Sequence, residues 1–176
     1  VHIFLDNVQY EKNGFNNRVK VRKGTDDQWL SVPVKTKGRF GANLLCETEI
    51  DDTQRWAAKH WLTLQQTYAR APHFGSHASF FDQMYRDRWS SLLELNLRGI
   101  GYLIEQLGIG CRLVKASSLG AAGQKADLVL NLCRAVGATT YVSGINGRSY
   151  LDKASFEEAG IMVKRYRVAL TDEERD

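Results

Sequence analysis

The sequence predicts an α/β fold: a mostly parallel sheet flanked by helices, with a small β-hairpin insertion near the N-terminus. The main observation is an arrangement that occurs three times, in which a predicted helix ends at a glycine and an apolar strand follows. The glycines are Gly108, Gly137 and Gly160, and the strands span 111–116, 139–143 and 161–166. Glycine is favoured there because it adopts the left-handed conformation without a Cβ penalty. Repeated helix-to-strand units favour a parallel sheet, which we expect within a single domain over residues 1–176.

The N-terminal part is predicted to be rich in β-structure. Residues 2–6 form an apolar strand, and residues 19–22 and 28–34 form the two strands of the hairpin. Pro33 has no backbone N–H to donate, so the second hairpin strand is expected at a sheet edge. Residues 44–50 are a further predicted strand.

The middle of the chain is predicted to be helical. Apolar spacing indicates one helix that ends near Ala71, a second that begins at Ser76, and a third that runs to Leu107. Each has an expected N-terminal cap, namely residues 51–53 for the first, Ser76 for the second, and Ser91 with Glu94 for the third.

Composition and charge exclude some classes of protein. The 176 residues, 43% of them hydrophobic, suffice for one domain with a buried core. No apolar run approaches the roughly 20 residues that cross a bilayer, so no membrane span is expected. The three cysteines are far apart, which favours reduced thiols in a cytoplasmic protein. The net charge of +4 permits an anionic ligand but does not indicate nucleic acid.

Polar residues follow three predicted strands, at the ends where parallel sheets bind ligands. Asp6 follows the first strand, Ser117 the second and Ser143 the third. We expect these segments to open onto one crevice that holds a small polar ligand, which the net charge permits to be anionic. The predicted substrate-binding residues, which offer amide, hydroxyl, backbone N–H and guanidinium groups, are Gln9, Asn17, Arg18, Ser117, Ser118, Ser143, Gly144, Gly147 and Arg148.

The segment 143–148 has two interpretations of about equal weight. Gly144 and Gly147 let the backbone approach a ligand closely, and Arg148 is suited to pair with a phosphate or carboxylate. A tight turn, in which glycine is needed only for its dihedral angles, explains the same residues.

The catalytic candidates are Asp6, Lys59 and His60. Asp6 is suited to orient a hydroxyl, to accept a hydrogen bond from an amine, or to act as a general base. A strand-end cap is the competing interpretation. Lys59 and His60 lie beside the aromatic face of the first predicted helix, where a surface lysine and a half-buried histidine are an adequate explanation.

No metal or cofactor follows from the sequence. His73 and His77 have the i, i+4 spacing of a zinc-binding helix, but Pro72 and Gly75 predict a loop, and the glutamate of the zinc motif is absent. There is no phosphate-binding lysine motif and no serine-hydrolase elbow.

An ordered set of motifs extends along nearly the whole chain. They are Leu5 to Gln9, Asn16 to Arg18, Trp29 to Val34, Trp56 with Lys59 and His60, Tyr68 to Phe74, Leu93 to Asn96, Ser117 to Leu119, Thr140 to Gly144, and Tyr150 to Asp152. In this order the chain resembles the WbqC-like family, which is found in bacterial gene clusters for O-antigen and other surface polysaccharides. Similar proteins usually begin with an upstream histidine-glutamine-proline motif and continue past Tyr166. We therefore expect a fragment that lacks both ends.

The resemblance implies a role in making or modifying a glycan precursor, often an amino sugar. Our hypothesis is a transferase that acylates or aminoacylates the amino group of an activated sugar. Asp6 would orient or deprotonate the acceptor, Gln9, Asn17 and Arg18 would bind its polar groups, and the segment 143–148 would hold an anionic portion.

Two other hypotheses remain. The chain is alternatively a non-catalytic subunit that binds a glycan intermediate or a partner protein through an aromatic helix face formed by Phe80, Phe81, Tyr85 and Trp89. Nucleic-acid binding through the basic hairpin is the least favoured, because charge that alternates with valine is typical of a half-exposed strand. The oligomeric state does not follow from the sequence.

Overall fold

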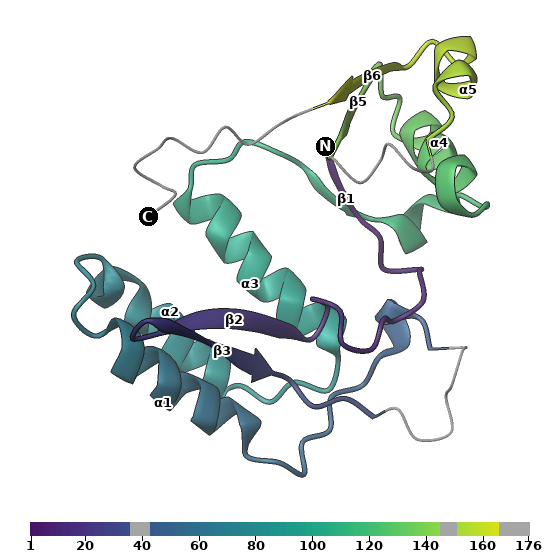
Figure 1. The fold of residues 1–176 in the computed structure, drawn as a ribbon. Helices are drawn as coiled ribbons and strands as arrows, with labels where there is room; N and C mark the ends of the chain where they lie inside the picture. The colour runs from purple at the N-terminus through teal and green to yellow at the C-terminus, as the bar shows by residue number, and fades with distance from the viewer. Residues whose placement is uncertain (36–42, 145–150, 166–176) are drawn as a thin grey trace. The chain divides into compact units, whose positions relative to one another are not determined.

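The computed structural model describes residues 1–35, 43–144 and 151–165, which form a mixed α/β fold (Figure 1). The chain divides into two compact units. We call Val1–Leu5 with Cys111–Asp176 the terminal unit, and Asp6–Gly110 the central unit. Each unit has its own hydrophobic core. The single domain over residues 1–176 stays a prediction.

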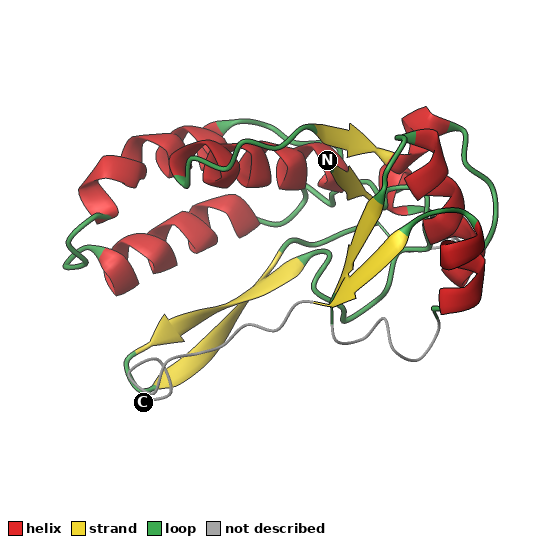
Figure 2. Ribbon diagram, turned by 90° about the horizontal axis from the view of Figure 1, so that it is seen from above, coloured by secondary structure: helices red, strands yellow, loops and turns green. Residues whose placement is uncertain are grey.

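The terminal unit contains two pairs of short parallel strands (Figure 2). The strand β1 (His2–Phe4) pairs with β4 (Leu113–Lys115), and β5 (Thr140–Ser143) pairs with β6 (Met162–Arg165). Among its described residues, the helices are the 3-10 helix η2 (Ala116–Leu119), α4 (Lys125–Ala135) and α5 (Lys153–Glu158). Phe156, which is fully buried, packs with Leu130, Cys133 and Ile161 in the core of this unit.

The described part of the central unit contains three α-helices, the short 3-10 helix η1 (Leu45–Glu47) and one antiparallel hairpin. The hairpin consists of β2 (Arg18–Lys23) and β3 (Asp26–Ser31), and the helices are α1 (Trp56–Tyr68), α2 (Phe74–Arg86) and α3 (Leu92–Gln106). The hairpin lies along α1 (Figure 1), where the N–H of Arg22 donates to the hydroxyl of Tyr68 over 3.1 Å. The core gathers apolar side chains from all three helices and from the segment before α1, namely Leu45, Ile50, Trp56, Met84, Leu92 and Leu95.

Glycine ends three helices in the same way, as the sequence predicts. After α3, the N–H of Gly108 donates to the carbonyl of Glu105 and the N–H of Ile109 to that of Ile104. The same pair of hydrogen bonds follows α4 at Gly137 and α5 at Gly160. The φ angles of the three glycines are +61°, +64° and +71°. This Schellman arrangement satisfies the last helix carbonyls and needs a left-handed residue, which glycine supplies.

The single, mostly parallel sheet is not found among the described residues. The strands form three separate two-stranded sheets instead. Parallel pairing is confirmed for β1 with β4 and for β5 with β6, and the hairpin is confirmed, with its second strand ending at Ser31 before Pro33. The first strand, predicted over residues 2–6, ends at Phe4. The carbonyl of Asp6 accepts a hydrogen bond from the N–H of Cys46, so it takes no part in pairing between strands.

The predicted strand 44–50 was wrong. Residues Leu45–Glu47 form a 3-10 helix, η1, with isolated bridges at Leu44, Glu49 and Ile50. The hydroxyl of Thr48 donates to the carbonyl of Leu44 over 2.9 Å and accepts from the amide of Asn43 over 3.1 Å. These local hydrogen bonds compete with a strand ladder, and here they prevail.

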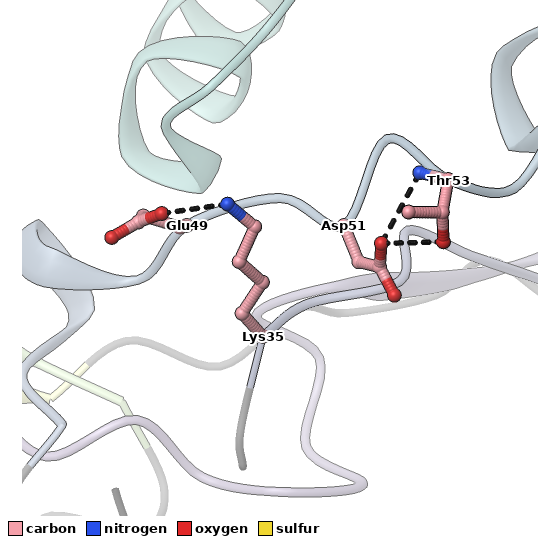
Figure 3. A network of polar contacts seen from close by, with 4 residues as sticks. All are labelled: Lys35, Glu49, Asp51 and Thr53. Carbon is pink, nitrogen blue, oxygen red and sulfur yellow. Dashed lines mark hydrogen bonds and ion pairs between the residues drawn. The ribbon is translucent and has the colours of Figure 1, made fainter. Parts of the chain in front are cut away.

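Two of the expected helix caps were also wrong. Asp51 accepts hydrogen bonds from the N–H and hydroxyl of Thr53, at 3.1 and 2.7 Å, and forms a turn five residues before α1 begins at Trp56 (Figure 3). Beside it, Lys35 and Glu49 form an ion pair of 2.9 Å (Figure 3). The helix α2 begins at Phe74, so Ser76 lies inside it.

The expected cap of α3 is confirmed. The hydroxyl of Ser91 accepts from the N–H of Glu94 over 3.3 Å. This hydrogen bond satisfies one of the otherwise unpaired N–H groups at the start of a helix.

Candidate functional site

The central unit contains a pocket of about 280 Å³ between the hairpin and the helices α1, α2 and α3. Three residues predicted for the site from the sequence line it: Asn17, Arg18 and His60. Pockets for drug-sized ligands occupy roughly 300–1,000 Å³, so this one is suited to a smaller molecule.

The turn that brings Asn17 to the pocket is held at two points. The side chain of Asn17 donates to the carbonyl of Val32 over 2.8 Å, and the N–H of Val32 donates back to the carbonyl of Asn17 over 2.7 Å. The amide of Asn96, on α3, donates to the carbonyl of Asn16 over 2.9 Å. The turn is therefore fixed both to the end of β3 and to the helix across the pocket.

Arg18 begins β2 and is held on two sides. One terminal nitrogen, Nη2, donates to the carbonyl of Asn13. The guanidinium carbon lies 4.2 Å from the centre of the Trp29 ring, within the range of a cation–π interaction. Burial raises the pKa of the nearby Tyr10 hydroxyl, an effect that the charge of Arg18 partly offsets. A guanidinium held in this way presents its remaining donors in a fixed direction.

Unpartnered polar atoms gather in the central unit. Among the described residues, five buried side-chain atoms have no hydrogen-bond partner: Asn7 Oδ1, Asn17 Oδ1, Arg18 Nε, Asn43 Oδ1 and Trp56 Nε1. Three of them belong to residues that line the pocket, and they are two donors and one acceptor. Leaving such an atom unpaired costs about 1–3 kcal/mol. These atoms have almost no accessible surface, so a ligand reaches them only where the surrounding side chains move.

His60 is held as a neutral ring. It is only 7% exposed, and its Nε2 lies 3.1 Å from the carbonyl of Ser31. A carbonyl only accepts hydrogen bonds, so Nε2 carries the proton of this bond. Burial lowers the pKa of His60, although the bond to Ser31 opposes this effect. In the neutral ring, Nδ1 therefore keeps its lone pair and is able to act as a base.

An aromatic group surrounds His60. The Trp56 ring lies edge-on to it at 5.3 Å, and the Tyr85 ring at 5.9 Å. Burial raises the pKa of Tyr85 to about 12, so its hydroxyl stays protonated at neutral pH. These rings reduce the access of water to the imidazole.

Three predicted residues of the central unit lie elsewhere. Lys59 is exposed on α1 and is not among the residues that line the pocket. Gln9 is exposed in an isolated bridge with Leu44. Asp6 is 1% exposed, and its carbonyl accepts from the N–H of Cys46. Their catalytic and binding roles stay predictions.

The remaining predicted residues belong to the terminal unit. Ser117 and Ser118 are exposed in η2, where the hydroxyl of Ser118 donates to the carbonyl of Lys115 over 2.7 Å. Ser143 is buried at the end of β5, and its hydroxyl donates to the carbonyl of Gly144 over 3.0 Å. Gly147 and Arg148 lie outside the described residues. The shared crevice of Asp6, Ser117 and Ser143 stays a prediction.

The pocket also contains residues that were not among the predicted site residues. Trp56 and Asn96 line it, and Gly99 is a lining residue without a side chain. A signal was present in the sequence, because Asn96 interrupts an apolar stretch of α3 between Leu95 and Leu97. An amide on the buried face of a helix needs a partner. Here it binds the backbone of Asn16.

In residues 1–35, 43–144 and 151–165, no group of three or more His, Cys, Asp or Glu side chains is placed to hold a metal ion. Of the helices in these ranges, none has both the length and the apolar character needed to cross a bilayer.

Comparisons with known proteins give a family and a relative. The model of the WbqC-like protein family matches residues 1–171. The protein named "Uncharacterized protein Rv1507c" of Mycobacterium tuberculosis is 37% identical over 162 residues, which cover 92% of this chain and 69% of that protein. No solved structure matches the chain.

Proposed function

Since the chain belongs to the WbqC-like protein family, we propose that it is a transferase that modifies a sugar precursor in surface-polysaccharide biosynthesis. The reaction is acyl or aminoacyl transfer to the amino group of the sugar. The observation that carries the proposal is the pocket of the central unit, which gathers Asn17, Arg18 and His60 beside unpartnered buried polar atoms. The polysaccharide context comes from the family resemblance.

The residues of the pocket match the needs of acyl transfer. His60 Nδ1 takes a proton from the attacking amine as the new N–C bond forms, and it passes that proton to the leaving group as the old acyl bond breaks. The carbonyl oxygen of the acyl group gains negative charge during the attack. The guanidinium of Arg18, which lines the pocket, would stabilise that charge.

An exposed aromatic rim beside the pocket supports a sugar acceptor. Phe15, which lines the pocket, is 77% exposed, and its ring lies 5.5 Å from that of Trp29. Aromatic rings at the edge of a pocket are suited to pack against the apolar face of a sugar ring. We place the apolar face of the sugar ring against Phe15, with its amino group directed toward His60.

Asp6, Lys59 and Gln9 of the central unit remain part of the proposal. Asp6 would position the acceptor through its carboxylate. Asp6→Asn should then lower turnover while the melting temperature changes little. Full turnover in this variant would remove Asp6 from the site and leave the pocket as the centre of the proposal.

A ligand screen followed by two matched variants tests the proposal. Thermal-shift measurements against nucleotide sugars, amino acids and acyl donors should show stabilisation by at least one acceptor and one donor. Transfer between that pair should fall in Arg18→Met by about 10- to 150-fold, because a hydrogen bond to a charged group contributes about 1.5–3 kcal/mol.

Lys20→Met is the matched control. Lys20 is also placed near the Trp29 ring, at 5.4 Å, but it is exposed and does not line the pocket. This variant should keep its turnover. Equal losses in the two variants would mean that Arg18 acts only through general charge, and the proposed site would be wrong.

The binding-subunit alternative has less support in the structure. Phe80, Phe81, Tyr85 and Trp89, which were its predicted contact face, are partly buried and pack against the core of the central unit. Aromatic side chains that pack inward contribute less to a binding surface.

A further inference from the structure

The pocket of the central unit has more apolar than polar surface to offer a ligand. Its aliphatic lining side chains are Leu30, Val32, Met84, Leu95, Ile100 and Leu103, beside Val19. Its polar lining residues are Asn16, Asn17, Arg18, His60, Tyr85 and Asn96, and Arg18 supplies the positive charge among them. The ligand portion that enters must therefore be mostly apolar, with a small polar head.

From this lining we infer that the pocket holds the acyl group of the donor: an aliphatic body with one carbonyl or carboxylate head. The inference rests on the proposed function and names the part of the substrate that enters the pocket. The head faces the guanidinium of Arg18, and the body packs on the aliphatic wall.

A sugar ring or a nucleotide fits the same pocket less well. A sugar carries several hydroxyl groups, and burying a hydroxyl without a partner costs at least about 1 kcal/mol. A diphosphate needs several cationic or N–H partners, whereas Arg18 is the one arginine or lysine among the described lining residues. These groups are better placed at the exposed rim, where water satisfies them.

The size of the pocket limits the acyl body. If each non-hydrogen atom occupies about the 30 Å³ that a water molecule takes in the liquid, a pocket of about 280 Å³ has room for roughly nine such atoms. A short acyl chain with its head group fits within this number.

Gly99 gives a direct means to test the inference. A Cβ atom at this position would lie 3.9 Å from the sulfur of Met84, an ordinary contact, and would enter the pocket wall. At Gly101, on the same helix, a Cβ atom would meet nothing within 4 Å and lies outside this pocket. Replacement of either glycine by leucine favours the helix. Gly99→Leu fills the pocket, and Gly101→Leu is its matched control.

The experiment measures the affinity of the wild-type chain and both variants for acetate, propanoate, butyrate and pentanoate by calorimetry. For the wild type, affinity should rise about fourfold per methylene group, since each buried methylene contributes about 0.8 kcal/mol. Gly99→Leu should abolish this rise, and Gly101→Leu should keep it. Pentanamide has a carbonyl group but no carboxylate. If it binds with an affinity similar to that of pentanoate, the carbonyl is sufficient as the head group.

Two outcomes would overturn the inference. One is an affinity that does not depend on chain length, and the other is displacement of pentanoate by glucosamine, which carries no acyl group. If either occurs while Arg18→Met still lowers transfer, the proposed function stands without this assignment. If the chain-length dependence is found but no transfer occurs with any donor, the proposed function falls and the acyl pocket stands. Melting temperatures of both leucine variants establish that each is folded.

Discussion

The two units of the chain differ in how the hydrogen-bonding groups of their polar side chains are satisfied. In the terminal unit, Ser118, Ser143 and Asp152 bind backbone groups one to three residues away. In the central unit, five buried polar atoms have no partner among the described residues, and three of them belong to residues that line one pocket. A locally satisfied group stabilises the fold, whereas an unpartnered one makes folding less favourable and favours a ligand. The contrast points to the central unit as the place to look for function.

The largest effect is expected from the core of the terminal unit. Phe156→Ala should lower the free energy of unfolding by about 3–5 kcal/mol, because it leaves a cavity at a fully buried position. All four tryptophans, at positions 29, 56, 61 and 89, belong to the central unit, so their fluorescence reports on that unit. Circular dichroism reports on both.

Because each unit has its own core, we expect the circular-dichroism midpoint of Phe156→Ala to shift more than the fluorescence midpoint. Coincident shifts would contradict this expectation. They would show that the two units unfold as the single domain that the sequence predicts.

A matched pair of asparagines sharpens the comparison between the units. Asn96→Ala should cost about 1–3 kcal/mol and weaken ligand binding, because the carbonyl of Asn16 loses its partner and the turn beside the pocket loosens. Asn131 makes a bond of the same kind and length, 2.9 Å, to the carbonyl of Ala122 in the terminal unit. Asn131→Ala should leave ligand affinity unchanged in titration calorimetry. Equal loss of affinity in both variants would argue against a pocket that is confined to the central unit.

The caps of two helices respond differently to pH. Ser91→Ala should cost about 1 kcal/mol at any pH, since a hydroxyl caps α3.

Asp152 caps α5, and hydrogen bonds from Ser155 and Ala154 lower its pKa below the ordinary 3.8. Its contribution is therefore full above pH 3.8 and is lost as the pH falls through the lowered value. Denaturant melts of Asp152→Ala and wild type should converge in acid. A difference that persists below that pKa would show that the carboxylate charge is not what caps the helix.

The smallest effect concerns the protonation of His60. The pKa of His60 in the folded chain is below the ordinary 6.5, which is its value in the unfolded chain. At a pH between the folded and the unfolded pKa, the unfolded chain therefore binds more protons than the folded chain. Stability is then full above pH 6.5 and declines as the pH falls toward the folded pKa. His60→Gln should remove this decline, while the exposed His73→Gln should keep it. Chemical denaturation from pH 5 to 8 measures both, and identical pH profiles for the two variants would rule out His60 as the source.

Much of the fold follows from local chemistry, and the sequence was sufficient for it. The helix ends at Gly108, Gly137 and Gly160 and the cap at Ser91 depend on residues within a few positions of each other, so the sequence predicts them correctly. The strand predicted over 44–50 was wrong because hydrogen bonds around Thr48 outweighed an apolar pattern. The apolar pattern of residues 44–50 is compatible with a strand and also with the 3-10 turn that forms.

The sequence by itself determined the mixed α/β content, the family, and the candidate status of Asn17, Arg18 and His60. Only the tertiary structure brought these three residues to one pocket together with Trp56, Asn96 and Gly99. The reason is physical. Helix ends and turns form from neighbouring residues, whereas a pocket forms where side chains from distant segments meet, as when Asn96 binds Asn16 across 80 positions of the chain.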